Sequence, residues 1–126
     1  MRSSSLSGVF VCLVFLLLIM GACSSSTKEP ADPLVAEGKR LFDKNCTSCH
    51  SIKPNLTITG PSLYGLASRA GERMAGLDAR EYLYLSITAP GDFLVEGFAN
   101  LMKADFAEKL SADEINSIIA YLMTLE

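Results

Sequence analysis

The amino-acid sequence predicts an all-α protein, and three features support this fold class. Two segments, 78–81 and 111–114, carry the polar-x-x-Glu arrangement that caps the N-terminus of a helix. Apolar residues behind the second segment recur at helical spacing. Strand signals are nearly absent, because the β-rich run at 57–59 is too short to count. We therefore expect three main helices, joined by short helices and loops.

The first main helix should begin after Pro33 and end near Asn45. Its apolar positions form one stripe, while charged residues occupy the other face. Gly38 lies within the stripe and costs about 1 kcal/mol relative to alanine. The close approach of a second helix is the usual reason for such a glycine, and the alternative is a glycine that a short helix merely tolerates.

The second and third main helices are predicted from their caps. Asp78 should start a helix through about Thr88, which the following Pro-Gly pair ends. Ser111 should cap the last helix, whose apolar stripe is Ile115, Ile118, Ile119 and Leu122. We expect the two terminal helices to cross at Gly38, with Phe42 and Tyr121 in contact. A turn and a short helix are expected at 60–66.

The chain is predicted to have three parts. Residues 9–20 form an unbroken apolar run of about 18 Å as a helix, which is short of the roughly 30 Å membrane core and typical of a signal peptide. The run ends in Met20-Gly21-Ala22-Cys23, which resembles a bacterial lipobox and implies a lipid on Cys23. Ordinary cleavage after Ala22 is the alternative. The prediction is a lipoprotein-type signal peptide (1–22), a lipid-anchored flexible tether (23–33) and a folded domain (34–126).

The charge of the predicted mature chain argues against binding to nucleic acid. Removing residues 1–22 leaves ten basic and fourteen acidic residues, a net charge of −4. Binding to nucleic acid through a positive field is therefore disfavoured. The tether of about ten residues has a root-mean-square reach on the order of 17 Å, which would hold an exported domain near its membrane.

Five consecutive residues, Cys46-Thr47-Ser48-Cys49-His50, form a C-x-x-C-H run that indicates attachment of c-type haem. Each thiol can form a thioether with the porphyrin, and the histidine can bind the iron. A bare C-x-x-C also occurs in zinc, iron–sulfur and redox sites. A zinc site needs about four ligands, whereas this run supplies three and contains the only histidine of the chain.

From residue 34 to 126 the sequence resembles class I cytochromes c, most closely the bacterial monohaem type. The matching motifs occur in the family's order: Gly38-x-x-x-Phe42, C-x-x-C-H at 46–50, Gly60-Pro61-x-Leu63-x-Gly65-Leu66, Arg69 before Gly71, a late Met102, Leu110-Ser111-x-x-Glu114-Ile115 and Tyr121-Leu122. The resemblance implies the cytochrome c fold around one covalently bound haem c with its iron.

The resemblance also implies roles for single residues. His50 is the proximal ligand, a backbone carbonyl at Pro61 accepts a hydrogen bond from it, and Arg69 binds a haem propionate. Met102 is the sixth ligand. Lys103 follows it where the family often has proline, which removes a rigid φ and adds a charge near the haem edge. Leu63, Tyr64, Leu66, Tyr82, Leu85 and Leu101 are candidates for the pocket wall, and a place in the general core is the alternative for each.

A His/Met iron has both axial positions filled, so the expected function is electron transfer and not catalysis. We expect a monomer that is anchored by lipid to the membrane, faces the periplasm or cell exterior, and exchanges electrons with redox proteins of a respiratory or photosynthetic chain. Two alternatives remain. One is a haem subunit of a larger oxidase or reductase complex, and the other is a gas sensor or enzyme with an open sixth position.

Overall fold

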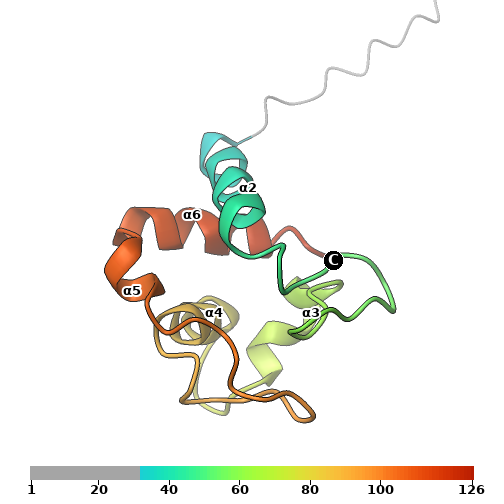
Figure 1. The fold of residues 1–126 in the computed structure, drawn as a ribbon. Helices are drawn as coiled ribbons and strands as arrows, with labels where there is room; N and C mark the ends of the chain where they lie inside the picture. Colours follow the sequence, from blue (N-terminus) through green and yellow to red (C-terminus); the bar gives the residue numbers. More distant parts are fainter. Residues whose placement is uncertain (1–31) are drawn as a thin grey trace, which may run out of the picture. The chain divides into compact units, whose positions relative to one another are not determined.

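Three helices carry the architecture of this computed structural model, which describes residues 32–126. They are α2 (Pro33–Asn45), α4 (Ala79–Thr88) and α6 (Ala112–Leu122) (Figure 1). Shorter elements lie between them: α3 (Leu66–Arg69), the 3₁₀ helix η1 (Ala70–Glu72) and α5 (Phe106–Lys109). Residues 32–126 contain no strand, so the all-α prediction is confirmed. The expected signal peptide, Cys23 and nearly all of the tether lie outside the described residues.

Helix α2 ends at Asn45 as predicted and begins at Pro33, one residue earlier than predicted. The carboxylate of Asp32 accepts a hydrogen bond of 2.8 Å from the backbone N–H of Leu34, which satisfies one of the free donors at the helix start. Pro33 occupies the first turn, where its missing N–H costs nothing. At the other end, the N–H of Cys46 donates to the carbonyl of Phe42.

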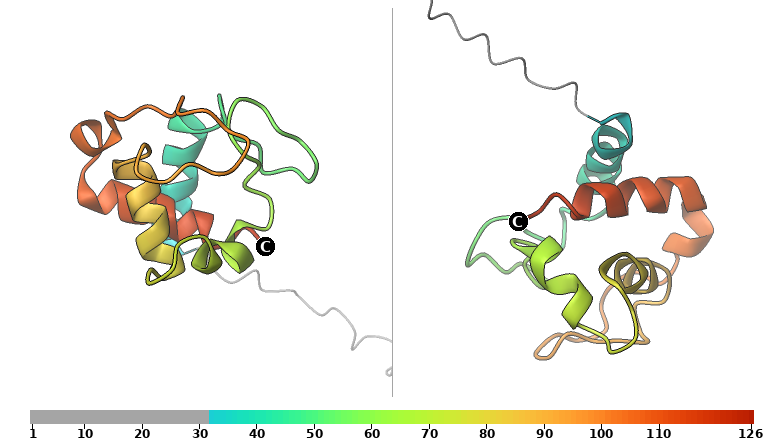
Figure 2. Two further views of the ribbon diagram at one scale, coloured as in Figure 1. Left: turned by 90° about the horizontal axis from the view of Figure 1, so that it is seen from below. Right: turned by 180° about the vertical axis from the view of Figure 1, so that it is seen from behind.

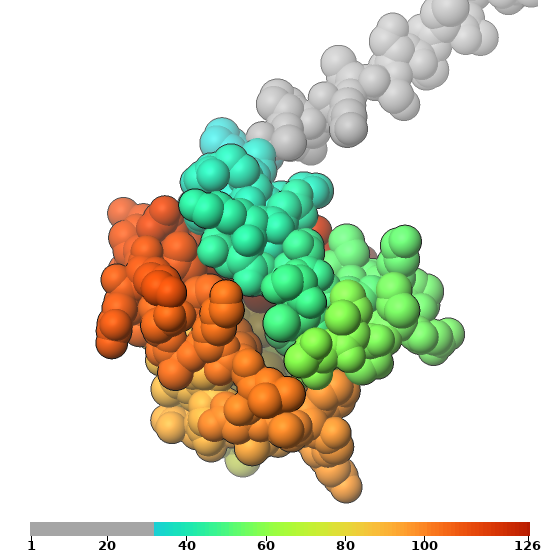
Figure 3. All heavy atoms as spheres, viewed as in Figure 1, coloured from blue at the N-terminus to red at the C-terminus, as the bar shows by residue number. Residues whose placement is uncertain are grey.

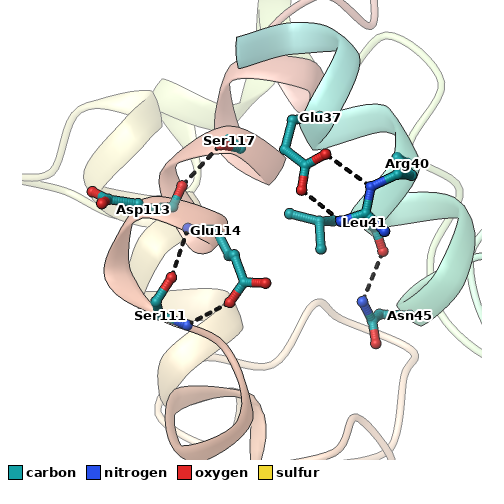
Figure 4. Close-up of polar contacts among 8 residues, drawn as sticks. All are labelled: Glu37, Arg40, Leu41, Asn45, Ser111, Asp113, Glu114 and Ser117. Carbon is teal, nitrogen blue, oxygen red and sulfur yellow. Dashed lines mark hydrogen bonds and ion pairs between the residues drawn. The ribbon is translucent and has the colours of Figure 1, made fainter. Parts of the chain in front are cut away.

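Helices α4 and α6 each begin with a complete capping box. In α6 the Ser111 hydroxyl accepts from the N–H of Glu114, and the Glu114 carboxylate accepts from the N–H of Ser111 at 2.8 Å (Figure 4). Asp78 and Glu81 make the same reciprocal pair at the start of α4. Each box satisfies two otherwise free backbone donors, so both helix starts are fixed by local sequence.

The terminal helices cross at Gly38, as predicted. A Cβ atom added to Gly38 would lie 1.8 Å from the backbone oxygen of Ser117, so α2 and α6 are in backbone contact there. Beside the crossing, the rings of Phe42 and Tyr121 pack at 5.2 Å between centroids. Side chains of α2 and α6 on both sides of the crossing are less than 3% exposed: Leu41, Phe42, Ile115, Ile118 and Ile119.

The remaining elements complete one core. Helix α4 contributes Tyr82, Leu83 and Ile87, and the short helices contribute Leu66 and Phe106. The segments 46–65 and 89–105, which lack long helices, lie on the same side of this core (Figures 1 and 2). Within the part of the chain that the structure describes, no helix is long and apolar enough to span a bilayer.

Candidate haem site

The C-x-x-C-H run forms one tight turn directly after α2. The backbone N–H groups of Cys49 and His50 both donate to the carbonyl of Cys46, at 3.1 and 2.9 Å. This turn brings the two thiols and the imidazole to the wall of the same cleft. Both cysteines are free and partly buried.

The His50 ring is held by the segment that follows it. The chain leaves the turn and returns at Gly60, whose N–H donates to the carbonyl of Cys49 at 2.8 Å. The carbonyl oxygen of Pro61 then lies 2.9 Å from Nδ1 of His50. Because a carbonyl only accepts hydrogen bonds, Nδ1 is the donor in this contact, and in the neutral ring Nε2 then has the free lone pair. This is the tautomer that a metal ligand needs, and the bond fixes the ring plane.

Gly60 allows the imidazole to lie against the backbone. A Cβ atom added there would lie 2.5 Å from Cε1 and 2.9 Å from Nδ1 of His50, which is closer than van der Waals contact permits. The sequence places Gly60 in the Gly-Pro motif, but its spatial role was not predicted. Its signal in the sequence is the Gly-Pro pair that follows the only histidine by ten residues.

Gly60→Ala should push the imidazole off its position. We expect a loss of about 1–3 kcal/mol in the free energy of unfolding, as for other overpacked sites, and a raised midpoint potential because a weaker Nδ1–H bond lowers the basicity of the ligand. Denaturant titration and spectroelectrochemistry of the haem-loaded protein measure these two quantities. Gly71→Ala is the control, since its added Cβ would lie no closer than 3.6 Å to any neighbour. Unchanged potential and stability in the Gly60 variant would contradict this account.

The cleft beside His50 is large and apolar. Its void measures about 1200 Å³, open solvent at its mouth included, and Figure 3 shows the surface hollowed there. Apart from His50, Lys103 is the one ionisable basic residue on the wall. Most of the remaining wall is aliphatic or aromatic, including Phe42, Leu63, Tyr82, Ile87, Phe93, Leu94, Phe98, Leu101 and Phe106.

The expected wall residues are only partly confirmed. Leu63, Tyr82 and Leu101 line the cleft as expected, whereas Leu66 packs into the core instead. Tyr64 and Leu85 are not among the lining residues. Sequence reasoning missed most of the 89–105 segment, in particular Phe93, which packs edge-to-face on Tyr82 at 5.6 Å. The segment has no helical or strand periodicity, so only its aromatic content could have marked it.

Met102 is the methionine that lines the cleft. Residues 32–126 contain two others, Met74 and Met123, and both pack against the hydrophobic core. The structure therefore brings one thioether sulfur and one imidazole to the same cavity, from segments 52 residues apart. Lys103 lies on the wall directly beside it.

Arg69 is engaged with the backbone and is not among the residues lining the cleft. Its guanidinium donates to the carbonyl of Ser62 at 2.6 Å and to the carbonyl of Tyr64. Burial, with a smaller contribution from Arg73, lowers the pKa of Arg69. These bonds tie α3 to the Gly-Pro segment, so Arg69 supports the turn that holds His50. Its other N–H groups are available to an anion, because a guanidinium has five.

Burial raises the pKa of the Cys46 thiol to about 11, and Cys49 adds to the effect. At neutral pH this sulfur is therefore an uncharged thiol. The cleft thus brings together two thiols, an imidazole and a thioether. Exposed leucines at its edge, with Leu101 at 65% and Leu94 at 46%, present apolar surface that a flat apolar group would cover. This donor set and this wall fit haem c.

An all-α fold with these donors defines a c-type haem protein, and comparison with known proteins agrees. The family model described as "Cytochrome c" matches residues 35–126. The chain is 31% identical over 84 residues to "Cytochrome c 2.1" of Caenorhabditis briggsae, covering 55% of this chain and 75% of that protein. It is 30% identical over 83 residues to "Cytochrome c type-1" of Ascaris suum, covering 54% and 74%.

The chain belongs to the cytochrome c family. As a member, it carries haem c with its iron, covalently bound, and Cys46 and Cys49 have the spacing that this attachment requires. Members of this family are typically electron carriers and not enzymes.

Proposed function

We propose that this protein transfers single electrons between membrane redox complexes of a respiratory or photosynthetic chain, held at the membrane by a lipid. The observation that carries the proposal is the shared cleft of His50 and Met102. In this proposal the Cys46 and Cys49 sulfurs would hold the haem covalently, while Nε2 of His50 and the sulfur of Met102 would bind its iron. The bound haem supplies one-electron chemistry at its iron, and methionine ligation raises its potential.

The remaining site residues act on orientation and access. The Pro61 carbonyl fixes the His50 tautomer, and Arg69 holds the neighbouring turn while offering donors to a propionate. The apolar walls exclude water, and the chain has no second histidine to serve as a distal acid or base. These features favour a closed carrier over an enzyme or gas sensor. We further propose that the protein is a monomer, binds no nucleic acid and meets its redox partners through small transient contacts.

A redox titration combined with carbon monoxide tests the closed site. We expect one reversible one-electron wave and an unchanged spectrum when carbon monoxide is added to the reduced protein at neutral pH. The physical reason is that the Met102 sulfur occupies the position that the gas needs. Binding of carbon monoxide without denaturant would overturn the proposal and favour the open-site alternative. Co-migration with an oxidase or reductase in native gels would instead assign the protein to a larger complex.

The lipid anchor is the second part of the proposal. It rests on the residues before the folded domain, where Cys23 follows an apolar run and two small residues. We propose that the protein is a bacterial lipoprotein, exported and anchored in the membrane so that it faces the periplasm or cell exterior. Cys23→Ser, placed in the mature chain and exported behind a cleavable signal peptide, should move the cytochrome from the membrane to the soluble fraction. Its retention on membranes after a salt wash would contradict the lipid anchor.

A further inference from the structure

Charge is unevenly distributed along the folded domain. Residues 44–71 contain three basic residues and no acidic residue. The rest of the described chain, 32–43 and 72–126, contains six basic and thirteen acidic residues. A domain that is negative overall therefore includes one segment without any carboxylate side chain.

The middle of this segment is a protruding loop, 51–59, which we call the apolar loop. Every residue from 52 to 59 is exposed. Three of them are large aliphatic side chains: Ile52 is 41% exposed, Leu56 is 44% exposed and Ile58 is 49% exposed. The loop extends beyond the helices on one side of the domain (Figures 1 and 3, green).

One cation lies among these aliphatic side chains. Lys53 is exposed, and none of the ion pairs within residues 32–126 includes it. By contrast, Lys39, Arg40 and Lys109 are each paired with a carboxylate on the same helix turn or the next. The apolar loop thus combines exposed aliphatic surface, a free ammonium group and the absence of negative charge.

We propose that the apolar loop binds an anionic lipid surface and orients the domain on it. Aliphatic side chains partition into the boundary between headgroups and acyl chains, and nearby cations are attracted to anionic headgroups. Protein interfaces instead concentrate their binding energy in Trp, Tyr and Arg, and residues 51–59 contain none of these. The composition of the loop therefore matches a lipid surface better than a protein partner.

The geometry of the proposed anchor permits this contact, and this step rests on the proposed function. Eight residues lie between Cys23 and Asp32, and the nine residue steps from one to the other span at most about 30 Å when extended. Helix α2, with 13 residues, is about 20 Å long, and the apolar loop follows its far end. The tether is therefore long enough for the loop to reach the same membrane. Because the loop connects His50 to Gly60, its binding would also set the orientation of the cleft.

Vesicle sedimentation tests the proposal without relying on the lipid anchor. The haem-loaded mature chain with Cys23→Ser is mixed with phosphatidylglycerol or phosphatidylcholine vesicles, and bound protein is measured by its visible absorbance. We expect binding to phosphatidylglycerol vesicles and little to phosphatidylcholine vesicles, with release as salt screens the attraction. The triple variant Ile52→Ser/Leu56→Ser/Ile58→Ser should bind at least ten-fold more weakly. Lys53→Gln should weaken binding about five-fold.

Two single variants show whether binding depends on the apolar loop or on any exposed leucine. Leu34 on α2 is 44% exposed, as is Leu56. Leu56→Ser should reduce vesicle binding at least three-fold, whereas Leu34→Ser should change it less than two-fold. Equal effects of the two, or no binding of the parent protein to phosphatidylglycerol vesicles, would overturn the proposal. A third outcome would also overturn the proposal. If the triple variant binds vesicles as well as the parent protein does, but membranes reduce its haem more slowly, the loop contacts a protein partner.

These outcomes are distinguishable from failure of the proposed function. The redox titration and the fractionation of the Cys23 variant do not involve the loop, while the vesicle assay uses protein that lacks the lipid. A circular-dichroism melt of each variant shows whether its fold is retained.

Discussion

Gly38→Ala should lower the free energy of unfolding by at least about 3 kcal/mol, the upper end of typical overpacking costs. Alanine favours a helix over glycine by about 1 kcal/mol, so propensity alone would predict stabilisation. Steric overlap outweighs this gain, because the new methyl group would lie 1.8 Å from the Ser117 backbone oxygen and 3.0 Å from Cβ of Tyr121. A backbone atom cannot rotate away, so α2 and α6 must separate, and separation exposes the most buried part of the core.

Denaturant unfolding of the haem-loaded protein, followed by far-UV circular dichroism, measures this effect. Gly71→Ala again serves as the control, since the nearest neighbour of its added Cβ is the Ala79 nitrogen at 3.6 Å, and its effect should stay within about 0.5 kcal/mol. If the Gly38 variant is as stable as the control, the α2–α6 crossing does not depend on backbone contact at this position.

The helices could be predicted because their signals are local. The caps at Asp78 and Ser111 are each complete within four residues, and the predicted ends of α2 and α4 agree with the structure. Gly38 added a long-range prediction, since an unfavourable glycine in an apolar stripe implies a close partner. The short helix expected at 60–66 instead begins at Leu66 as α3, because Gly65 directly before it has a left-handed φ of 64° that a right-handed helix cannot include. Helices α5 and η1 were not predicted, as each is too short to show periodicity.

Only those parts of the haem site that short sequence motifs specify could be predicted. The C-x-x-C-H run and the Gly-Pro pair specify chemistry by spacing, and the structure places His50 against Pro61 accordingly. Residues between 89 and 105 also line the cleft, and no local sequence pattern predicts where this segment lies. Phe93 lies on the cleft because it packs on Tyr82, a contact that the sequence alone does not reveal. Arg69 shows the same limit, since its present partners are the carbonyls of Ser62 and Tyr64.

Met102→Leu should remove the sixth ligand while conserving side-chain volume. Leucine and methionine exchange in packed sites for less than about 1.5 kcal/mol, so the fold should be retained. The lost thioether should abolish the sulfur-to-iron charge-transfer band of the oxidised protein and open the position to carbon monoxide. The midpoint potential should fall by at least about 0.1 V, within the roughly 0.8 V range that axial ligands set.

Met74→Leu and Met123→Leu provide matched controls, because both side chains pack against the core and neither lines the cleft. They should keep the charge-transfer band and the potential of the parent protein. Optical spectra and spectroelectrochemistry of the three variants therefore test ligation against packing. A band that survives in the Met102 variant, or disappears in a control, would show that another methionine binds the iron.

The Met102→Leu variant also tests whether Lys103 can bind the iron in place of Met102. It lies on the cleft wall next to Met102, and its amine could bind the iron only after losing a proton. A protonated amine has no lone pair to give to the iron, so we expect the Met102→Leu site to stay open to carbon monoxide. The double variant Met102→Leu/Lys103→Gln should behave identically there. Stronger carbon monoxide binding by the double variant would show that Lys103 occupies the position vacated by Met102.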